Sequence, residues 1–276
     1  MFDGAMGTAI HARNLSPDDF QGQEGCSEVL VLSRPDVVRE IHAAYFEAGA
    51  QVVETNTFGA SRVVLAEYQM AERVREINVA AARLAREVAA QFPAPRFVAG
   101  SLGPTTKMPS LGHIGFAELA AAYEEQAAAL LEGGVDVLLI ETCQDILQAK
   151  SALYGVNRAR RAAAALAGRD TPVAIQVTID TSGAMLMGTD IGAALTTLEP
   201  FNPLFLGLNC ATGPELMNDP IRYLGDNSPH PISCQPNAGL PRNEGGQTVF
   251  PLTPDELARW QRLFVTEYGV SVVGGR

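Results

Sequence analysis

Short apolar runs alternate with longer amphipathic stretches along the whole chain. Several of these runs are apolar at every position and do not alternate with polar residues, which is typical of strands in a parallel sheet that is covered on both faces. The stretches between them carry helix signals, such as Pro35 at a first turn and Gly133–Gly134 after a last turn. The predicted strands are 51–55, 96–100, 136–141, 173–179, 204–208, 231–234 and 270–273, and the predicted helices are 34–48, 63–92 (as one helix or two), 116–132, 145–167 and 253–268.

The order of these elements predicts an α/β fold. A first strand ending at Phe2–Asp3 completes a set of eight strands, and eight parallel βαβ units close a (β/α)8 TIM barrel. Only two residues precede Asp3 and no helix follows the last strand, so we expect a barrel clipped at strand 1 and after strand 8. A doubly wound open sheet is the alternative, which the lack of a Gly-x-Gly-x-x-Gly motif disfavours. The expected organisation is one domain over residues 1–276.

Composition and charge narrow the class of protein. The chain has 276 residues, is 47% hydrophobic and carries a formal net charge of −11, which argues against a nucleic-acid groove or a membrane-surface patch. Four cysteines without a Cys-x-x-Cys pair fit neither a disulfide scaffold nor a zinc ribbon. With no signal-peptide pattern and no long apolar run, the sequence predicts a cytoplasmic protein with reduced thiols.

Polar residues follow most of the predicted strands. In a barrel the active site lies at the carboxyl ends of the strands, so Asp3, Glu54 and Glu141 are expected at one rim. Asp3 and Glu141 could together bind an ammonium group, act as an acid/base pair or simply cap helices, and the same alternatives apply to Glu54. An Asp before Gly, as in Asp3–Gly4, is also a common turn residue.

Cys210 is the thiol best placed for chemistry. It follows the strand at 204–208 in Gly207-Leu208-Asn209-Cys210-Ala211, where a soft thiolate would suit zinc. A buried, small apolar side chain is the alternative role. Cys143 and Cys234 also lie near strand ends, whereas the four histidines show no metal-ligand spacing.

A set of short stretches in a fixed order identifies a family resemblance. Together they resemble the homocysteine S-methyltransferase domain family, and within it the N-terminal homocysteine-binding modules of cobalamin-dependent methionine synthases. The stretches are Asp3–Thr8, Leu30–Pro35, Ala44–Ala50, Glu54–Phe58, Gly100–Thr105, Leu139–Thr142, Gly207–Ala211 and Pro236–Pro241.

The resemblance implies a chemistry for the thiol. It implies a barrel that holds zinc through three cysteine thiolates, with Cys210 as the first ligand and Asn209 shaping the metal site. Zinc deprotonates a coordinating thiol, so homocysteine would bind the metal as a thiolate and attack an electrophilic methyl group to give methionine. Cys210 is therefore the expected catalytic residue.

The resemblance also implies the substrate contacts and the partners. Asp3 and Glu141 would hold the ammonium group of L-homocysteine, and the backbone around Gly4 and Ala5 its carboxylate. The methyl group would come from methylcobalamin, recharged by methyltetrahydrofolate, on cobalamin- and folate-binding modules that this chain lacks. The run Ala66–Met70 favours that donor over a sulfonium such as S-methylmethionine, which stays the alternative.

The end of the chain departs from the family pattern. The family's other two ligands are an adjacent cysteine pair after a Gly-Gly, whereas here Arg276 follows Gly274–Gly275 and both cysteines are missing. We expect the chain to be a fragment of a longer reading frame with these ligands after Gly275. A non-catalytic relic of the fold without zinc is the alternative, and the activity of the chain as given is doubtful.

Overall fold

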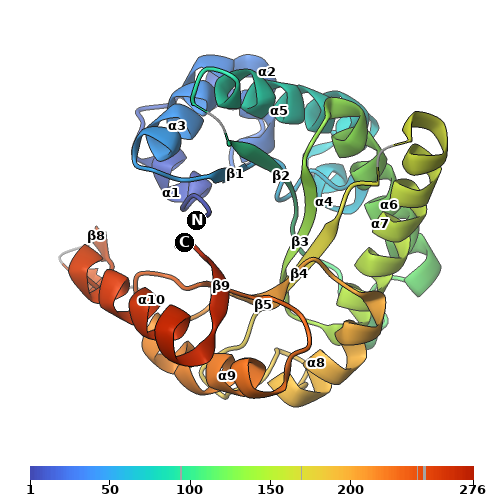
Figure 1. Ribbon diagram of the computed structural model, residues 1–276. Coiled ribbons are helices and arrows are strands. Elements are labelled where there is room, and N and C mark those ends of the chain that lie inside the picture. The colour runs from blue at the N-terminus through green and yellow to red at the C-terminus, as the bar shows by residue number, and fades with distance from the viewer. Residues whose placement is uncertain (94, 169, 241, 245–246) are drawn as a thin grey trace.

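The computed structural model describes residues 1–93, 95–168, 170–240, 242–244 and 247–276. Seven parallel strands form one curled sheet with helices on its outer side (Figure 1). Each strand pairs with the next one along the chain, as a (β/α)8 barrel requires. The strands are β1 Val52–Glu54, β2 Phe97–Leu102, β3 Val137–Cys143, β4 Val173–Val177, β5 Leu206–Asn209, β6 Ile232–Gln235 and β9 Val270–Val273.

The N-terminal residues take the place of the remaining strand. Phe2 forms a parallel bridge with Val52 of β1, and its backbone N–H donates to the carbonyl oxygen of Val273 in β9 at 2.8 Å. The backbone N–H of Asp3 donates to the carbonyl oxygen of Val52 at 3.0 Å. This short segment therefore joins the two edges of the sheet, and both termini lie beside each other (Figure 1). The predicted clipped TIM barrel is confirmed.

The predicted helices are present with small shifts at their ends. The stretch at 63–92 divides into two helices, α4 and α5, which are separated by two 3₁₀ turns. Asp145 caps the helix after β3, because its carboxylate accepts the backbone N–H of Leu147. The helices are α3 Pro35–Glu47, α4 Arg62–Leu65, α5 Val74–Ala89, α6 Phe116–Gly133, α7 Ile146–Ala167 and α10 Pro254–Tyr268.

Several elements were not predicted. Two short helices and two longer ones complete the outer layer, and a hairpin of two short antiparallel strands precedes α10. Pro241, which ends one of the stretches behind the family resemblance, lies outside the described residues. The additional elements are α1 Met6–His11, α2 Leu30–Ser33, α8 Ile191–Leu198, α9 Pro214–Asn227, β7 Arg242–Glu244 and β8 Gln247–Val249.

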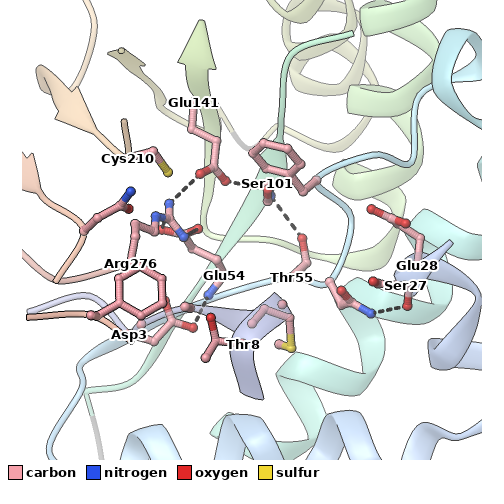
Figure 2. A pocket seen from close by; sticks show the side chains of 18 residues that line it. Asp3, Thr8, Ser27, Glu28, Glu54, Thr55, Ser101, Glu141, Cys210 and Arg276 are labelled. Atoms are coloured by element: carbon pink, nitrogen blue, oxygen red, sulfur yellow. Dashed lines mark hydrogen bonds and ion pairs between the residues drawn. The ribbon is translucent and has the colours of Figure 1, made fainter. Parts of the chain in front are cut away.

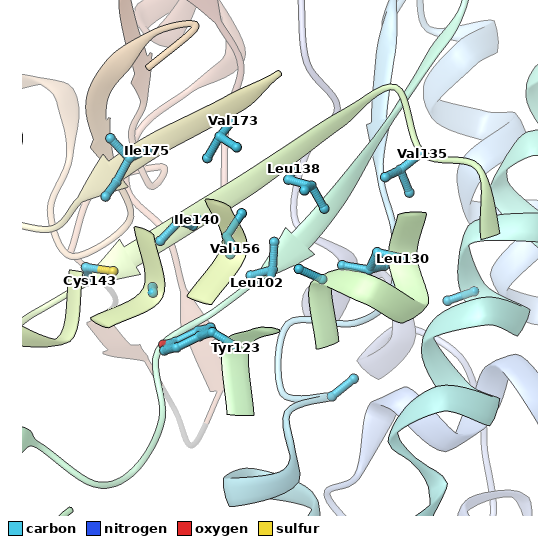
Figure 3. Packing of buried hydrophobic residues seen from close by; sticks show 14 of the residues in the cluster. Leu102, Tyr123, Leu130, Val135, Leu138, Ile140, Cys143, Val156, Val173 and Ile175 are labelled. Atoms are coloured by element: carbon cyan, nitrogen blue, oxygen red, sulfur yellow. The ribbon is translucent and has the colours of Figure 1, made fainter. Parts of the chain in front are cut away.

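Two hydrophobic clusters lie on opposite faces of the strands. Leu138 and Ile140 of β3 pack with the outer helices, close to Tyr123 of α6 and Val156 of α7 (Figure 3). Leu139, between them in sequence, belongs to a smaller second cluster with Phe2, Ala99, Val137, Ala174 and Phe205. This alternation explains why the strands read as continuous apolar runs. None of the helices in the described part of the chain is long and apolar enough to cross a membrane.

Candidate active site

Three carboxylates meet at the carboxyl ends of the strands. Asp3 follows the N-terminal bridge, Glu54 is the last residue of β1, and Glu141 lies in β3; all three are buried. The Asp3 carboxylate accepts the backbone N–H of Glu54 at 2.9 Å, and Oε1 of Glu141 accepts the Ser101 hydroxyl at 2.6 Å. We call Asp3, Glu54 and Glu141 the carboxylate cage. Sequence analysis assigned Asp3 and Glu141 to one site, and the structure places them there.

The guanidinium of Arg276 lies inside this cage (Figure 2). Its Nη1 is 2.6 Å from Oε2 of Glu54, and its Nη2 is 2.5 Å from Oε2 of Glu141. Nη2 also donates to Oε1 of Glu54 at 2.8 Å, so one guanidinium bridges two acids of different strands. Arg276 was not predicted as a site residue, and Glu54 was expected at this rim without an assigned role. Glu54 shared the strand-end signal of Asp3 and Glu141, whereas the direction of a long arginine side chain has no sequence signal.

Burial dominates the protonation of the cage. Desolvation raises the pKa of Glu141 above its usual range, an effect that Arg276 opposes and the charge of Glu54 reinforces. Desolvation also raises the pKa of Asp3 well above its usual range, with a further increase from Glu54. Three buried acids in one place cannot all stay ionised without a cation. A group that brings positive charge into the cage therefore favours the ionised carboxylates.

Cys210 directly follows β5 and contributes its side chain to the same rim. Its backbone has φ 58° and the next residue, Ala211, has φ 52°, a left-handed pair without glycine. Such conformations are costly for residues with a Cβ and cluster at functional sites. The strain is consistent with a backbone held in place to aim a side chain, here the sulfur of Cys210, at the pocket.

Asn209 connects the thiol with the cage. Its Nδ2 donates to Oε2 of Glu141 at 3.2 Å and lies 3.4 Å from the Cys210 sulfur. Its Oδ1 accepts the backbone N–H of Thr142 at 2.9 Å, and the Thr142 hydroxyl donates to the sulfur at 3.7 Å. Burial raises the pKa of the Cys210 thiol to about 11, although Arg276 acts in the opposite direction. At neutral pH the thiol is therefore protonated.

The described residues do not form a three-ligand metal site. Across the parts of the chain that the structure describes, no group of three or more His, Cys, Asp or Glu side chains is arranged to hold a metal ion. Cys210 contributes the thiol that lines the pocket, whereas Cys143 is buried in the core and Cys234 packs against the sulfur of Met217. Zinc sites have at least three protein ligands, so the residues present do not fit zinc by themselves.

One pocket of about 340 Å³ unites these groups. The cage, Arg276, Cys210 and the loop Gly4–Thr8 all line it. Phe58, which is 41% exposed, and Phe250, which is 40% exposed, line it as well and are open to solvent. The volume suits a small amino acid, with charged groups at one end and a sulfur ligand beside them.

Comparison with known proteins decides the family. The sequence profile of the homocysteine S-methyltransferase family matches residues 1–275. The chain belongs to the homocysteine S-methyltransferase family. The predicted resemblance is thereby confirmed.

Two curated relatives of this methyltransferase-family chain are methionine synthases. The enzyme of Mycobacterium tuberculosis is 48% identical over 276 residues, and that of Mycobacterium leprae is 47% identical. Each alignment covers 99% of this chain but 23% of the relative, so the chain spans about a quarter of the length of these proteins.

Solved structures support the fold of this family member. The metallated form of the homocysteine methyltransferase MmuM from Escherichia coli superposes with a TM-score of 0.76 at 23% identity, covering 99% of this chain and 90% of that one. The apo form of the same protein gives a TM-score of 0.68. At this level of identity the similarity concerns the barrel alone.

Proposed function

We propose that this barrel binds L-homocysteine and presents its sulfur for methylation to L-methionine, as the homocysteine-binding module of a methionine synthase. The observation that carries the proposal is the shared pocket: Cys210 and the carboxylate cage line one cavity and are linked through Asn209. Family membership and the two methionine synthase relatives support the same reaction.

The carboxylate cage would hold the substrate's ammonium group. The family resemblance implies this role for Asp3 and Glu141, and the position of Glu54 adds a third acceptor. Oδ1 of Asp3 is buried without a hydrogen-bond partner among the described residues, which leaves one acceptor ready for a donor. An ammonium group offers three donors and a positive charge, and it would favour the ionised form of acids whose pKa values burial raises.

The loop after the N-terminal segment would hold the substrate's carboxylate. Gly4 and Ala5 line the pocket, and the backbone N–H groups of both have no acceptor among the described residues. The Tyr45 hydroxyl donates to the carbonyl oxygen of Ala5 at 3.1 Å and fixes the loop. A Cβ at Gly4 would lie 3.0 Å from the Tyr45 ring, so a side chain here would collide with that support. With both ends of the amino acid held, the homocysteine thiol would extend toward Cys210.

Zinc belongs to the proposal as the family's resident metal. Cys210 would be one of three thiolate ligands, and Asn209 and Thr142 would orient its sulfur. When bound, zinc would supply the charge that keeps a thiol deprotonated at neutral pH. The family pattern expects the other two ligands directly after Gly274–Gly275, where this chain has Arg276, so residues 1–276 supply one thiolate.

The methyl donor would reach the pocket from a partner. We propose methylcobalamin as donor and methyltetrahydrofolate as the source of its methyl group, both on other modules. Phe58 and Phe250, which line the pocket and are exposed, would be available to contact such a donor.

Calorimetric titration with L-homocysteine tests the proposal. The wild-type chain and the Glu141→Gln variant are compared, because this substitution removes one charge with little change in shape. A charge-assisted hydrogen bond contributes roughly 1.5–3 kcal/mol, so the variant should bind about 10- to 100-fold more weakly. Equal affinity in the two proteins would reduce Glu141 to a structural residue and contradict the assignment.

A further inference from the structure

Among the described residues that line this pocket, Arg276 is the single Lys, Arg or His side chain. Its side chain is 13% exposed, and the side chains of its partners Glu54 and Glu141 are 7% and 2% exposed. Its backbone N–H donates to the carbonyl oxygen of Pro236 at 3.0 Å, which anchors the residue at the rim. A guanidinium that makes three bonds to two buried acids is a specific occupant of their site and not a solvated surface charge.

We propose that Arg276 is an internal occupant of the carboxylate cage, which excludes the substrate's ammonium group until the arginine withdraws. This inference rests on the proposed function, since it assigns to Arg276 the place that homocysteine's ammonium would take. In this reading the structure shows a closed form of the pocket. The arginine and the substrate compete for the same carboxylates.

The electrostatics of the cage require one cation at a time. Without Arg276, Asp3, Glu54 and Glu141 would face one another in a buried site, and their mutual repulsion would be unrelieved. A single guanidinium satisfies Glu54 and Glu141 but does not reach Oδ1 of Asp3, which keeps no partner among the described residues. The cage therefore suits a cation that can contact all three acids, as a small ammonium group can.

The fit of Arg276 is incomplete in a second respect. Its Nε is buried and has no acceptor among the described residues. An unsatisfied buried donor costs free energy, so the arginine holds the cage less well than a fully satisfied cation would. The arginine can leave the cage by rotation about its own side-chain bonds, while its backbone N–H stays bonded to the carbonyl oxygen of Pro236.

The same residue accounts for the poor fit to zinc. Arg276 directly follows Gly274–Gly275, the position where the family pattern places a cysteine ligand, and its positive charge acts on Cys210. A positive charge near the Cys210 sulfur opposes the binding of a second cation there. While Arg276 occupies the cage, its charge therefore disfavours zinc at Cys210.

A small guanidinium compound tests occupancy of the cage without homocysteine. The Arg276→Ala variant should melt at a lower temperature than wild type near neutral pH, and millimolar methylguanidinium should restore part of that loss. The wild type, whose cage is already filled, should show no such gain. The matched control is Arg276→Ala with Glu54→Gln and Glu141→Gln, which should not respond. No response in Arg276→Ala, or an equal response in wild type, would overturn the assignment. If Arg276→Ala does not fold, Arg276→Gln replaces it.

Homocysteine affinity then separates this inference from the proposed function. Arg276→Gln should bind L-homocysteine about 10-fold more tightly than wild type, because substrate no longer displaces a paired arginine. If wild type binds homocysteine and Arg276→Gln binds equally or more weakly, the competition is refuted while the proposed function stands. If no variant binds homocysteine but methylguanidinium still restores Arg276→Ala, the proposed function fails and the cage remains a cation site filled by Arg276.

Discussion

Glu141 and Cys210 share one hydrogen-bond donor, the side-chain amide of Asn209. Its Nδ2 is 3.2 Å from Oε2 of Glu141 and 3.4 Å from the Cys210 sulfur. The residue proposed to bind the substrate's amine and the residue proposed to bind the metal are thus held by the same side chain. We therefore expect a substitution of Glu141 or Cys210 to shift the position of the other side chain through Asn209.

Replacement of Asn209 tests this link. The side chain is fully buried, and Asn209→Ala would leave the backbone N–H of Thr142 without its acceptor, whereas Glu141 would keep Ser101 and Arg276 as donors. Leaving a buried polar group unsatisfied costs about 1–3 kcal/mol, so we expect the free energy of unfolding to fall by at least that amount. Denaturant unfolding measures the loss. The matched control is Asn227→Ala, an exposed residue at the end of α9. A loss no larger than that of the control would show that the amide does not hold the site together.

The Cys210 thiol should react slowly at neutral pH. Its pKa of about 11 leaves about one thiolate in 10⁴ molecules at pH 7, against a few per cent for a free thiol. Alkylation by iodoacetamide, followed by peptide mass spectrometry, should therefore accelerate as the pH rises toward 11. Cys143 and Cys234 are fully buried and should stay unmodified in the folded chain. Rapid modification of Cys210 at pH 7 would mean that its environment favours the thiolate.

The 276-residue chain should not retain zinc. One thiolate cannot replace three, and Arg276 places a positive charge near Cys210. Metal analysis after exhaustive dialysis should find much less than one zinc per chain. Stoichiometric, tightly held zinc would show that other groups of this chain complete the site.

His42 should make the fold sensitive to acid. It lies in α3, and neither ring nitrogen has a hydrogen-bond partner among the described residues. Burial lowers its pKa from 6.5 to about 4, so the unfolded chain binds this proton more readily than the folded one. The free energy of unfolding is therefore not reduced by His42 above pH 6.5. It falls as the pH drops from 6.5 toward 4, by up to about 3 kcal/mol.

A His42→Leu variant provides the comparison for this pH dependence. Leucine cannot bind a proton, so its unfolding free energy should fall less between pH 7 and pH 4 than that of wild type. Parallel pH profiles of the two proteins, measured by urea unfolding, would exclude His42 as the source of the acid sensitivity.

The barrel could be predicted from the sequence because its strands are buried on both faces. Runs such as Val137–Ile140 are apolar throughout, since alternate residues enter the outer and inner clusters. Helix α9 escaped prediction although Gly213–Pro214 marks its start, because Pro220 interrupts its pattern. Helix α8 was not predicted either, because its eight residues make about two turns, too few to show a 3.6-residue hydrophobic repeat.

Part of the site could also be predicted. Because the carboxyl ends of barrel strands converge at one rim, Asp3, Glu141 and Cys210 were predicted to lie there, and all three line one pocket. Glu54 obeys the same rule but was not chosen. The position of Arg276 depends on where Gly274 and Gly275 leave the barrel, and the sequence alone does not define that direction.

Whether Glu141 recognises the amine of the substrate can be measured with a ligand that lacks this amine. Calorimetry compares L-homocysteine with 4-mercaptobutanoate, which lacks the ammonium group, on wild type, Glu141→Gln and the exposed control Glu267→Gln. The account predicts that wild type and the control prefer homocysteine by about 10-fold or more, and that Glu141→Gln loses most of this preference while its affinity for 4-mercaptobutanoate stays nearly unchanged. An equal preference for homocysteine in Glu141→Gln and wild type would contradict the account.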